Sequence, residues 1–175
     1  MIACIINHGR DLSQTTASLK ANGIEHIIVE EGKIGPGLSE AALRNRYLRK
    51  LADGDWFLMI DSDEELMEID KSRLRGDFCL VKMLLGKDFV LLPRLIRYRE
   101  GMRYVTHYFI GKPTTYKNLS FVPNTFNRKT SYPYVATIRH LREKHSQEEL
   151  EFKRQQKKME KRTEKKMRSK GVTIL

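Results

Sequence analysis

Cysteine is scarce in this chain of 175 residues, which contains only two. Cys4 and Cys79 both lie within apolar runs that are typical of strands, so we expect two buried, reduced thiols. Two cysteines in such positions do not make the disulfide framework of a small secreted domain. The cysteines and histidines also lack the spacing of a zinc site.

Long apolar runs are missing as well. No stretch approaches the roughly 20 apolar residues that a membrane-spanning helix needs. The apolar start of the chain is too short for a secretion signal and has no basic residues before it. We therefore expect a soluble, cytoplasmic protein whose length fits one domain with one substantial core.

Positive charge is plentiful but unevenly placed. The formal net charge is +11, and residues 141–170 hold twelve Lys or Arg against six Glu, about half of that excess. We therefore divide the chain into a domain at 1–140 and a basic C-terminal helix and tail at 141–175. Solvation is the simplest role for this helix. Peripheral binding to an anionic membrane, protein assembly and, less favoured, binding to nucleic acid are the alternatives.

The first sixty residues predict alternating strands and helices. Apolar runs predict strands at 2–6, 25–29 and 56–60, and helical spacing predicts helices at 11–21 and 39–52. This β-α-β-α-β order implies parallel strands joined by right-handed crossovers.

The pattern changes in the second part of the domain. Strands are predicted at 78–85, 89–98 and 102–110, and the short glycine-containing turns between them imply antiparallel pairing. A highly charged helix is predicted from about residue 141. The expected fold class is α/β, with a mixed sheet flanked by helices, in which a parallel N-terminal half is followed by antiparallel strands.

Two aspartates directly follow the strand predicted at 56–60. In open α/β sheets, ligands bind beyond the carboxyl ends of the strands, where Asp61 and Asp63 would lie. Two carboxylates there suit a hard divalent cation that bridges phosphates. The alternative is structural, because Ser62 and Glu65 form a capping-box pattern that predicts the start of a helix.

Polar side chains also follow the first two predicted strands. Asn7, His8 and Arg10 follow the first strand, and Glu30 follows the second. The carboxyl ends of parallel strands meet at one edge of a sheet, so these side chains would face the same crevice as Asp61. Ordinary loop polarity is the alternative explanation.

An ordered set of motifs surrounds the two aspartates. The first half of the set is Arg44-Asn45, Gly54-Asp55-Trp56, an apolar strand and Asp61-Ser62-Asp63-Glu64. The second half is Pro93-Arg94-Leu95-Ile96-Arg97, Gly101, Tyr104 and His107. In this order the motifs resemble those of GT-A glycosyltransferases, especially the broad family 2 type, with Asp61-x-Asp63 as the DXD motif. The resemblance covers roughly residues 2–140.

The resemblance implies a GT-A, Rossmann-like fold and a glycosyltransferase of the hexosyltransferase type. It also implies a UDP- or GDP-sugar donor, inversion at the sugar, and Mn²⁺ or Mg²⁺ on Asp63, with Asp61 nearer the ribose and metal-bound water. The residues that would bind the donor are Asn7, His8, Arg10, Glu30, Arg44, Asn45 and Asp61. There is a physical reason for such a reaction to use a metal, because a divalent cation stabilises the charge that develops on a departing diphosphate.

A general base is harder to assign. No carboxylate occurs between Glu100 and Glu143, and Tyr108 stands where related sequences often have Glu after the motif histidine. We therefore predict Asp88 or His107 as the catalytic base. Glu100 is the alternative, ranked below Asp88 because Glu100-Gly101 is most simply a hairpin turn. His140 resembles a family histidine near the edge of the active site.

Two other functional classes are consistent with the same residues. A metal-dependent nuclease or nucleotidyltransferase could use Asp61, Asp63 and Glu64, with the basic segment on nucleic acid. A non-catalytic binding module could retain the fold without a base. The acceptor of the leading hypothesis is unknown, and a homodimer could complete its site.

Overall fold

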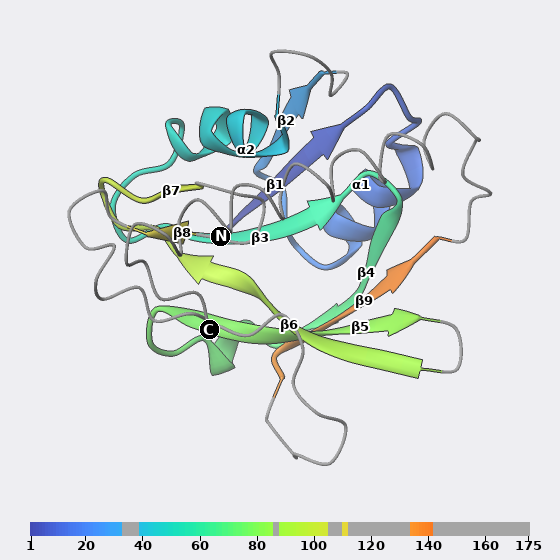
Figure 1. Cartoon of the computed structure of the whole chain (residues 1–175). Helices are drawn as coiled ribbons and strands as arrows, with labels where there is room; N and C mark the ends of the chain where they lie inside the picture. The colour runs from blue at the N-terminus through green and yellow to red at the C-terminus, as the bar shows by residue number, and fades with distance from the viewer. Residues whose placement is uncertain (33–38, 86–87, 105–109, 112–133, 142–175) are drawn as a thin grey trace, which may run out of the picture.

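The computed structural model describes residues 1–32, 39–85, 88–104, 110–111 and 134–141. It is an α/β protein whose seven-stranded mixed sheet curls along its length (Figure 1). The elements are β1 (Ile2–Asn7), α1 (Ser13–Ala21), β2 (Ile27–Glu31), α2 (Glu40–Leu48), β3 (Trp56–Asp61), β4 (Glu64–Ile69), the 3-10 turn η1 (Lys71–Arg73), β5 (Phe78–Leu85), β6 (Asp88–Arg97), β7 (Arg103–Tyr104), β8 (Ile110–Gly111) and β9 (Ala136–His140).

The strand order of the sheet is β2-β1-β3-β6-β5-β9-β4. β1 lies between β2 and β3 and is parallel to both, which confirms the predicted parallel N-terminal half. β6 then runs antiparallel to β5, as the short connection between them predicted, and it also runs antiparallel to β3. β9 is parallel to β5, and β4 pairs antiparallel with β9 at the edge of the sheet.

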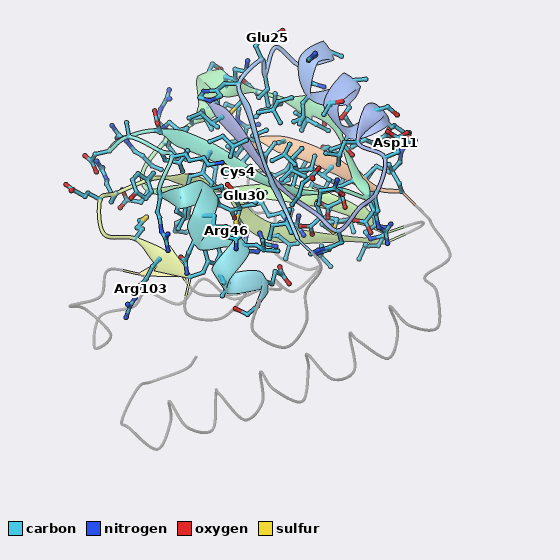
Figure 2. All side chains as sticks on the ribbon, turned by 90° about the horizontal axis from the view of Figure 1, so that it is seen from above. Cys4, Asp11, Glu25, Glu30, Arg46 and Arg103 are labelled. Carbon is cyan, nitrogen blue, oxygen red and sulfur yellow. The ribbon has the colours of Figure 1, made fainter. Side chains whose placement is uncertain are left out.

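The helices α1 and α2 lie on opposite faces of the sheet (Figure 2). Strand side chains alternate between the faces, so each face has its own apolar core. Ile5 and Leu58 belong to the core on the α1 side, whereas Cys4 and Phe57 pack with α2. Both cysteines are buried and free, as predicted. Among the described residues, no helix is both long and apolar enough to cross a membrane.

The helix predicted at 39–52 is shorter than expected. Ser39 caps it, because its side chain accepts a hydrogen bond from the Ala42 N–H, but α2 ends at Leu48. The Ala52 N–H instead donates to the Asp55 carboxylate at 2.8 Å, and Gly54 has φ +89°. This turn redirects the chain into β3, and a left-handed position of this kind favours glycine.

The capping-box prediction for Ser62 and Glu65 is wrong. No helix starts there, and β4 begins at Glu64 after a tight turn. The Thr15 hydroxyl of α1 donates to the Glu64 carbonyl at 2.8 Å, and Leu66 is buried in the α1-side core. Pairing with β9 therefore overrides the local helical signal.

The strand predicted at 102–110 is also wrong as a single element. β7 and β8 are two short strands that pair with each other in a separate two-stranded sheet. His107 lies outside the described residues, as does the predicted helix in 141–175 beyond residue 141.

Candidate functional site

Three acidic residues, Asp61, Asp63 and Glu64, form a cluster at the carboxyl end of β3, and we call them the carboxylate cluster. Asp61 is the last residue of β3 and lies opposite Ile6 of β1. Strand alternation puts Asp61 on the same face as Met59, which packs on the α2 side. The cluster thus lies beyond the carboxyl ends of parallel strands, as predicted.

Asp61 faces two arginines from different elements. Its Oδ1 lies 3.4 Å from Nη2 of Arg44 on α2, and its Oδ2 lies 3.4 Å from Nη2 of Arg94 on β6. The Asp61 side chain remains 36% exposed, so it is also open to solvent.

Asp63 contacts a different pair of groups. Its Oδ2 lies 3.6 Å from Nη1 of Arg10 and 3.4 Å from Nε2 of His140. The Asp63 carbonyl also accepts a hydrogen bond from the Leu141 N–H at 2.7 Å. The loop after β1 and the end of β9 therefore both position Asp63.

Glu64 points inward and is 1% exposed. Its Oε2 accepts hydrogen bonds from Nη1 of Arg94 at 2.6 Å and from the Asp61 N–H at 2.8 Å. Glu64 therefore fixes both the backbone of Asp61 and the guanidinium of Arg94.

A β-bulge positions Arg94. The register shifts between the Cys79–Leu95 and Val81–Leu92 pairs, so Pro93 and Arg94 together lie opposite Leu80. Proline cannot donate to a ladder and is tolerated inside a sheet mainly at edges and bulges. Bulges commonly redirect a side chain, and here Arg94 points to Glu64 and Asp61.

Arg44 is held by its own set of contacts. Its Nε and Nη2 lie 2.9 and 2.5 Å from Oε1 of Glu40, and its Nη1 lies 3.3 Å from the Tyr47 hydroxyl. Its guanidinium carbon lies 5.5 Å from the centre of the Tyr104 ring. This buried network fixes Arg44 above the α2-side core.

The pKa values of the buried groups follow from burial and neighbouring charge. Burial raises the pKa of Glu64 to about 7, Arg94 lowers it in part, and Asp61 raises it further. Burial disfavours the charge of Arg94, but Glu64 and then Asp61 outweigh it and raise its pKa above the ordinary value. Arg94 therefore stays charged, whereas Glu64 titrates near neutrality.

This raised pKa predicts how stability depends on pH in a chelating buffer. Because the folded carboxyl keeps its proton to about pH 7, the part of the stability that comes from protonating Glu64 is fully present below pH 4.5 and is lost as the pH rises through 7. The unfolding free energy of the wild type, minus that of Glu64→Gln, should fall by about 3 kcal/mol across this interval. Urea denaturation of both proteins at stepped pH measures it, and a flat difference would exclude a raised pKa.

Four of the predicted residues, Arg10, Arg44, Asp61 and Asp63, are brought together at the carboxylate cluster, and His140 joins them. Two other predicted residues support the site from a distance. Asn7 is buried and exchanges two hydrogen bonds with the backbone of Arg10, at 2.9 and 3.1 Å. Asn45 does the same with the backbone of Tyr104, at 2.7 and 2.9 Å.

The remaining predicted residues lie elsewhere. His8 Nδ1 lies 2.7 Å from the Gly32 carbonyl, and Glu30 lies 2.6 Å from Lys50 Nζ on the α2 side of the sheet (Figure 2). The backbone of Asp88 begins β6, six residues and roughly 20 Å along the strand from Arg94. The role of Asp88, like that of His107, stays a prediction.

Sequence reasoning assigned no role to Arg94 or Glu40 and did not foresee that Glu64 would be buried. Pro93 inside an apolar strand pattern was the available signal for the bulge that directs Arg94. Among the described residues, no group of three or more His, Cys, Asp or Glu is arranged to hold a metal ion.

Comparison of the sequence with protein-family models gives no match, and comparison with curated proteins gives none either.

Proposed function

We propose that this chain is a metal-dependent, GT-A-type glycosyltransferase resembling family 2, which transfers a sugar from a UDP- or GDP-sugar to an acceptor with inversion. The observation that carries the proposal is the mixed charge beyond β3. The carboxylates of Asp61 and Asp63 lie beside the guanidinium groups of Arg10, Arg44 and Arg94. A metal-bound diphosphate needs both kinds of group, carboxylates for the cation and donors for the phosphates.

The donor set fits Mn²⁺ or Mg²⁺ when part of the coordination comes from phosphates. Mg²⁺ is usually held by one or two carboxylates together with substrate phosphates and water, rather than by a cage of protein ligands alone. Asp63 and Asp61 would supply those carboxylates, with His140 beside Asp63 at 3.4 Å. When bound, the cation would act as a Lewis acid that stabilises the departing nucleoside diphosphate.

Residues of the chain itself hold the charged groups of the proposed site in position before a ligand binds. Glu64 holds the Asp61 backbone, and the Asn7 amide closes the loop that carries Arg10. Such fixed charges stabilise developing charge without reorganising during the reaction.

The burial of Glu64 favours a transferase over a nuclease. A nuclease centre that used Glu64 as a third metal ligand would need this carboxylate at the surface, but its side chain is 1% exposed and holds Arg94. The residues proposed to bind the donor and the metal all lie outside the basic segment at 141–175.

Thermal unfolding of the full chain with UDP- and GDP-sugars, with and without Mn²⁺, tests the proposal. We expect stabilisation by a donor nucleotide only when Mn²⁺ is present, because binding to the folded state raises its stability. No response to any nucleotide, together with salt-sensitive binding to DNA or RNA, would reject the transferase in favour of a nucleic-acid enzyme.

The predicted base is tested separately. Asp88→Asn and His107→Ala are compared by turnover under conditions in which both variants bind the donor as the wild type does. We expect one of them to lose about a hundredfold or more in turnover, the usual contribution of a positioned base. Wild-type turnover in both would exclude both assignments.

A further inference from the structure

Asp61 lies between two guanidinium groups, with one on each carboxylate oxygen. Both distances, to Arg44 and to Arg94, are 3.4 Å. An Arg–carboxylate hydrogen bond in a strong pair is shorter, at about 2.7–2.9 Å. Asp61 therefore contacts both arginines loosely.

Each arginine contacts a glutamate more closely. Arg94 lies 2.6 Å from Glu64, and Arg44 lies 2.5 Å from Glu40. Both glutamate side chains are less exposed than that of Asp61, at 15% for Glu40 and 1% for Glu64 against 36%. The two guanidinium groups are thus fixed in place, and Asp61 is the partner that can exchange.

The charges of the described groups around Asp61 and Asp63 indicate what would accompany a cation here. Four carboxylates (Glu40, Asp61, Asp63 and Glu64) lie among three guanidinium groups (Arg10, Arg44 and Arg94), which gives these seven groups a formal charge of −1 when all are ionised. A divalent cation alone on Asp61 would make the sum positive and repel two fixed arginines nearby. A diphosphate brought with the cation supplies negative oxygens to the same guanidinium groups.

We infer that Arg44 and Arg94 form the phosphate subsite. A diphosphate takes the place of Asp61 on the two guanidinium groups, and only then does Asp61 bind the cation. The inference rests on the proposed function and adds to it a role for Arg94 and a coupling between the ligands. The cation and the nucleoside diphosphate bind tightly together and weakly apart. Glu64 and Glu40 are positioning residues that keep the two guanidinium groups in place.

Mn²⁺ binding to the full chain, measured by the electron paramagnetic resonance of free Mn²⁺ and corrected with a protein-free titration for the Mn²⁺ that the nucleotide itself chelates, tests this coupling. In the wild type, UDP or GDP should tighten Mn²⁺ binding at least about tenfold, within the usual range of coupling between sites. In Arg94→Gln, Mn²⁺ alone should bind about tenfold tighter than in the wild type, because one competing cation is gone. The nucleotide should then add less than about threefold.

Matched variants keep the result interpretable. Arg99→Gln removes an arginine that also lies 3.4 Å from an aspartate, Asp77, but beyond the far end of β6, and should leave every Mn²⁺ affinity unchanged. Arg44→Gln should also tighten the binding of Mn²⁺ alone. If Arg94→Gln does not fold, the affinity of Arg44→Gln for Mn²⁺ tests the proposal in its place. Arg94→Lys keeps the charge without the planar fork, and should keep weak binding of Mn²⁺ alone.

The outcomes separate the two levels of the proposal. If Mn²⁺ and the nucleotides bind to the wild type but independently, the coupling is overturned and the proposed function stands. If Arg44→Gln and Arg94→Gln bind Mn²⁺ alone no more tightly than the wild type does, the competition between arginine and cation is overturned. If neither ligand binds the wild type in any combination, both proposals fail.

Discussion

Replacing Asp63 with asparagine is expected to abolish the Mn²⁺-dependent stabilisation by a donor nucleotide and to lower turnover about a hundredfold or more. An amide keeps the shape of the side chain but loses the negative charge that a hard cation requires. A metal that acts as a Lewis acid contributes several kcal/mol to the barrier, and 2.7 kcal/mol corresponds to about a hundredfold in rate. Thermal unfolding and release of nucleoside diphosphate measure the two effects.

The expected loss should be confined to the site. Asp63 contacts Arg10 and His140 near the surface, so its amide variant should fold and melt close to the wild type without ligands. Asp77→Asn is the matched control, because Asp77 also lies 3.4 Å from one arginine but outside the carboxylate cluster. Asp63→Asn with an unchanged Mn²⁺ dependence would show that Asp63 is not a ligand.

Replacing Glu64 with alanine should destabilise the fold by about 3–5 kcal/mol at pH 8, since it removes one partner of a buried ion pair. Arg94 would keep only the longer contact to Asp61 at 3.4 Å, and the Asp61 N–H would lose its acceptor at 2.8 Å. Urea denaturation measures this loss. Asp77→Ala breaks an exposed pair and should cost less than about 1 kcal/mol.

A double-mutant cycle separates the ion pair from the cavity. Glu64→Ala combined with Arg94→Met removes both charges, so its cost should fall below the sum of the two single costs by about 1–3 kcal/mol. Additive costs would mean that Glu64 and Arg94 do not stabilise each other, and the anchoring of the phosphate subsite would then lack its basis.

The N-terminal half of the fold was predictable because its strands are locally distinct. The apolar runs that begin at Ile2 and Trp56 are long, bounded by turns and buried on both faces, which is typical of parallel strands covered by helices. The position of Asp61 followed directly, since it depends only on where β3 ends. The end of α2 was missed because the Asp55 turn stops a sequence that could continue as a helix.

The edge strand β4 was not predictable from local pattern. Residues 64–69 are rich in glutamate and follow a capping-box pattern, yet they pair with β9, where Glu64 lies opposite His140. The strand β9 is about seventy residues away from β4 in the chain, and a local sequence pattern carries no information about it.

The candidate site, like the fold, was only partly predictable from the sequence. Asp61 and Asp63 were found from the end of one strand, but their partners come from elements that meet only in the folded protein. Arg94 reaches Glu64 because β6 returns antiparallel to β3 and carries a bulge at Pro93. The sequence contained both residues in a family-like order, but their contact at 2.6 Å required the sheet.

The central claim is that Mn²⁺ binds at Asp61 and Asp63 together with a nucleoside diphosphate. Paramagnetic broadening by Mn²⁺ in amide NMR spectra of the full chain tests it most directly, with Mg²⁺ as the diamagnetic reference. With UDP or GDP present, broadening should centre on residues 61–64 and extend to Arg94 and His140, and without nucleotide it should be much weaker. Broadening centred elsewhere, or none with either nucleotide, would contradict the claim.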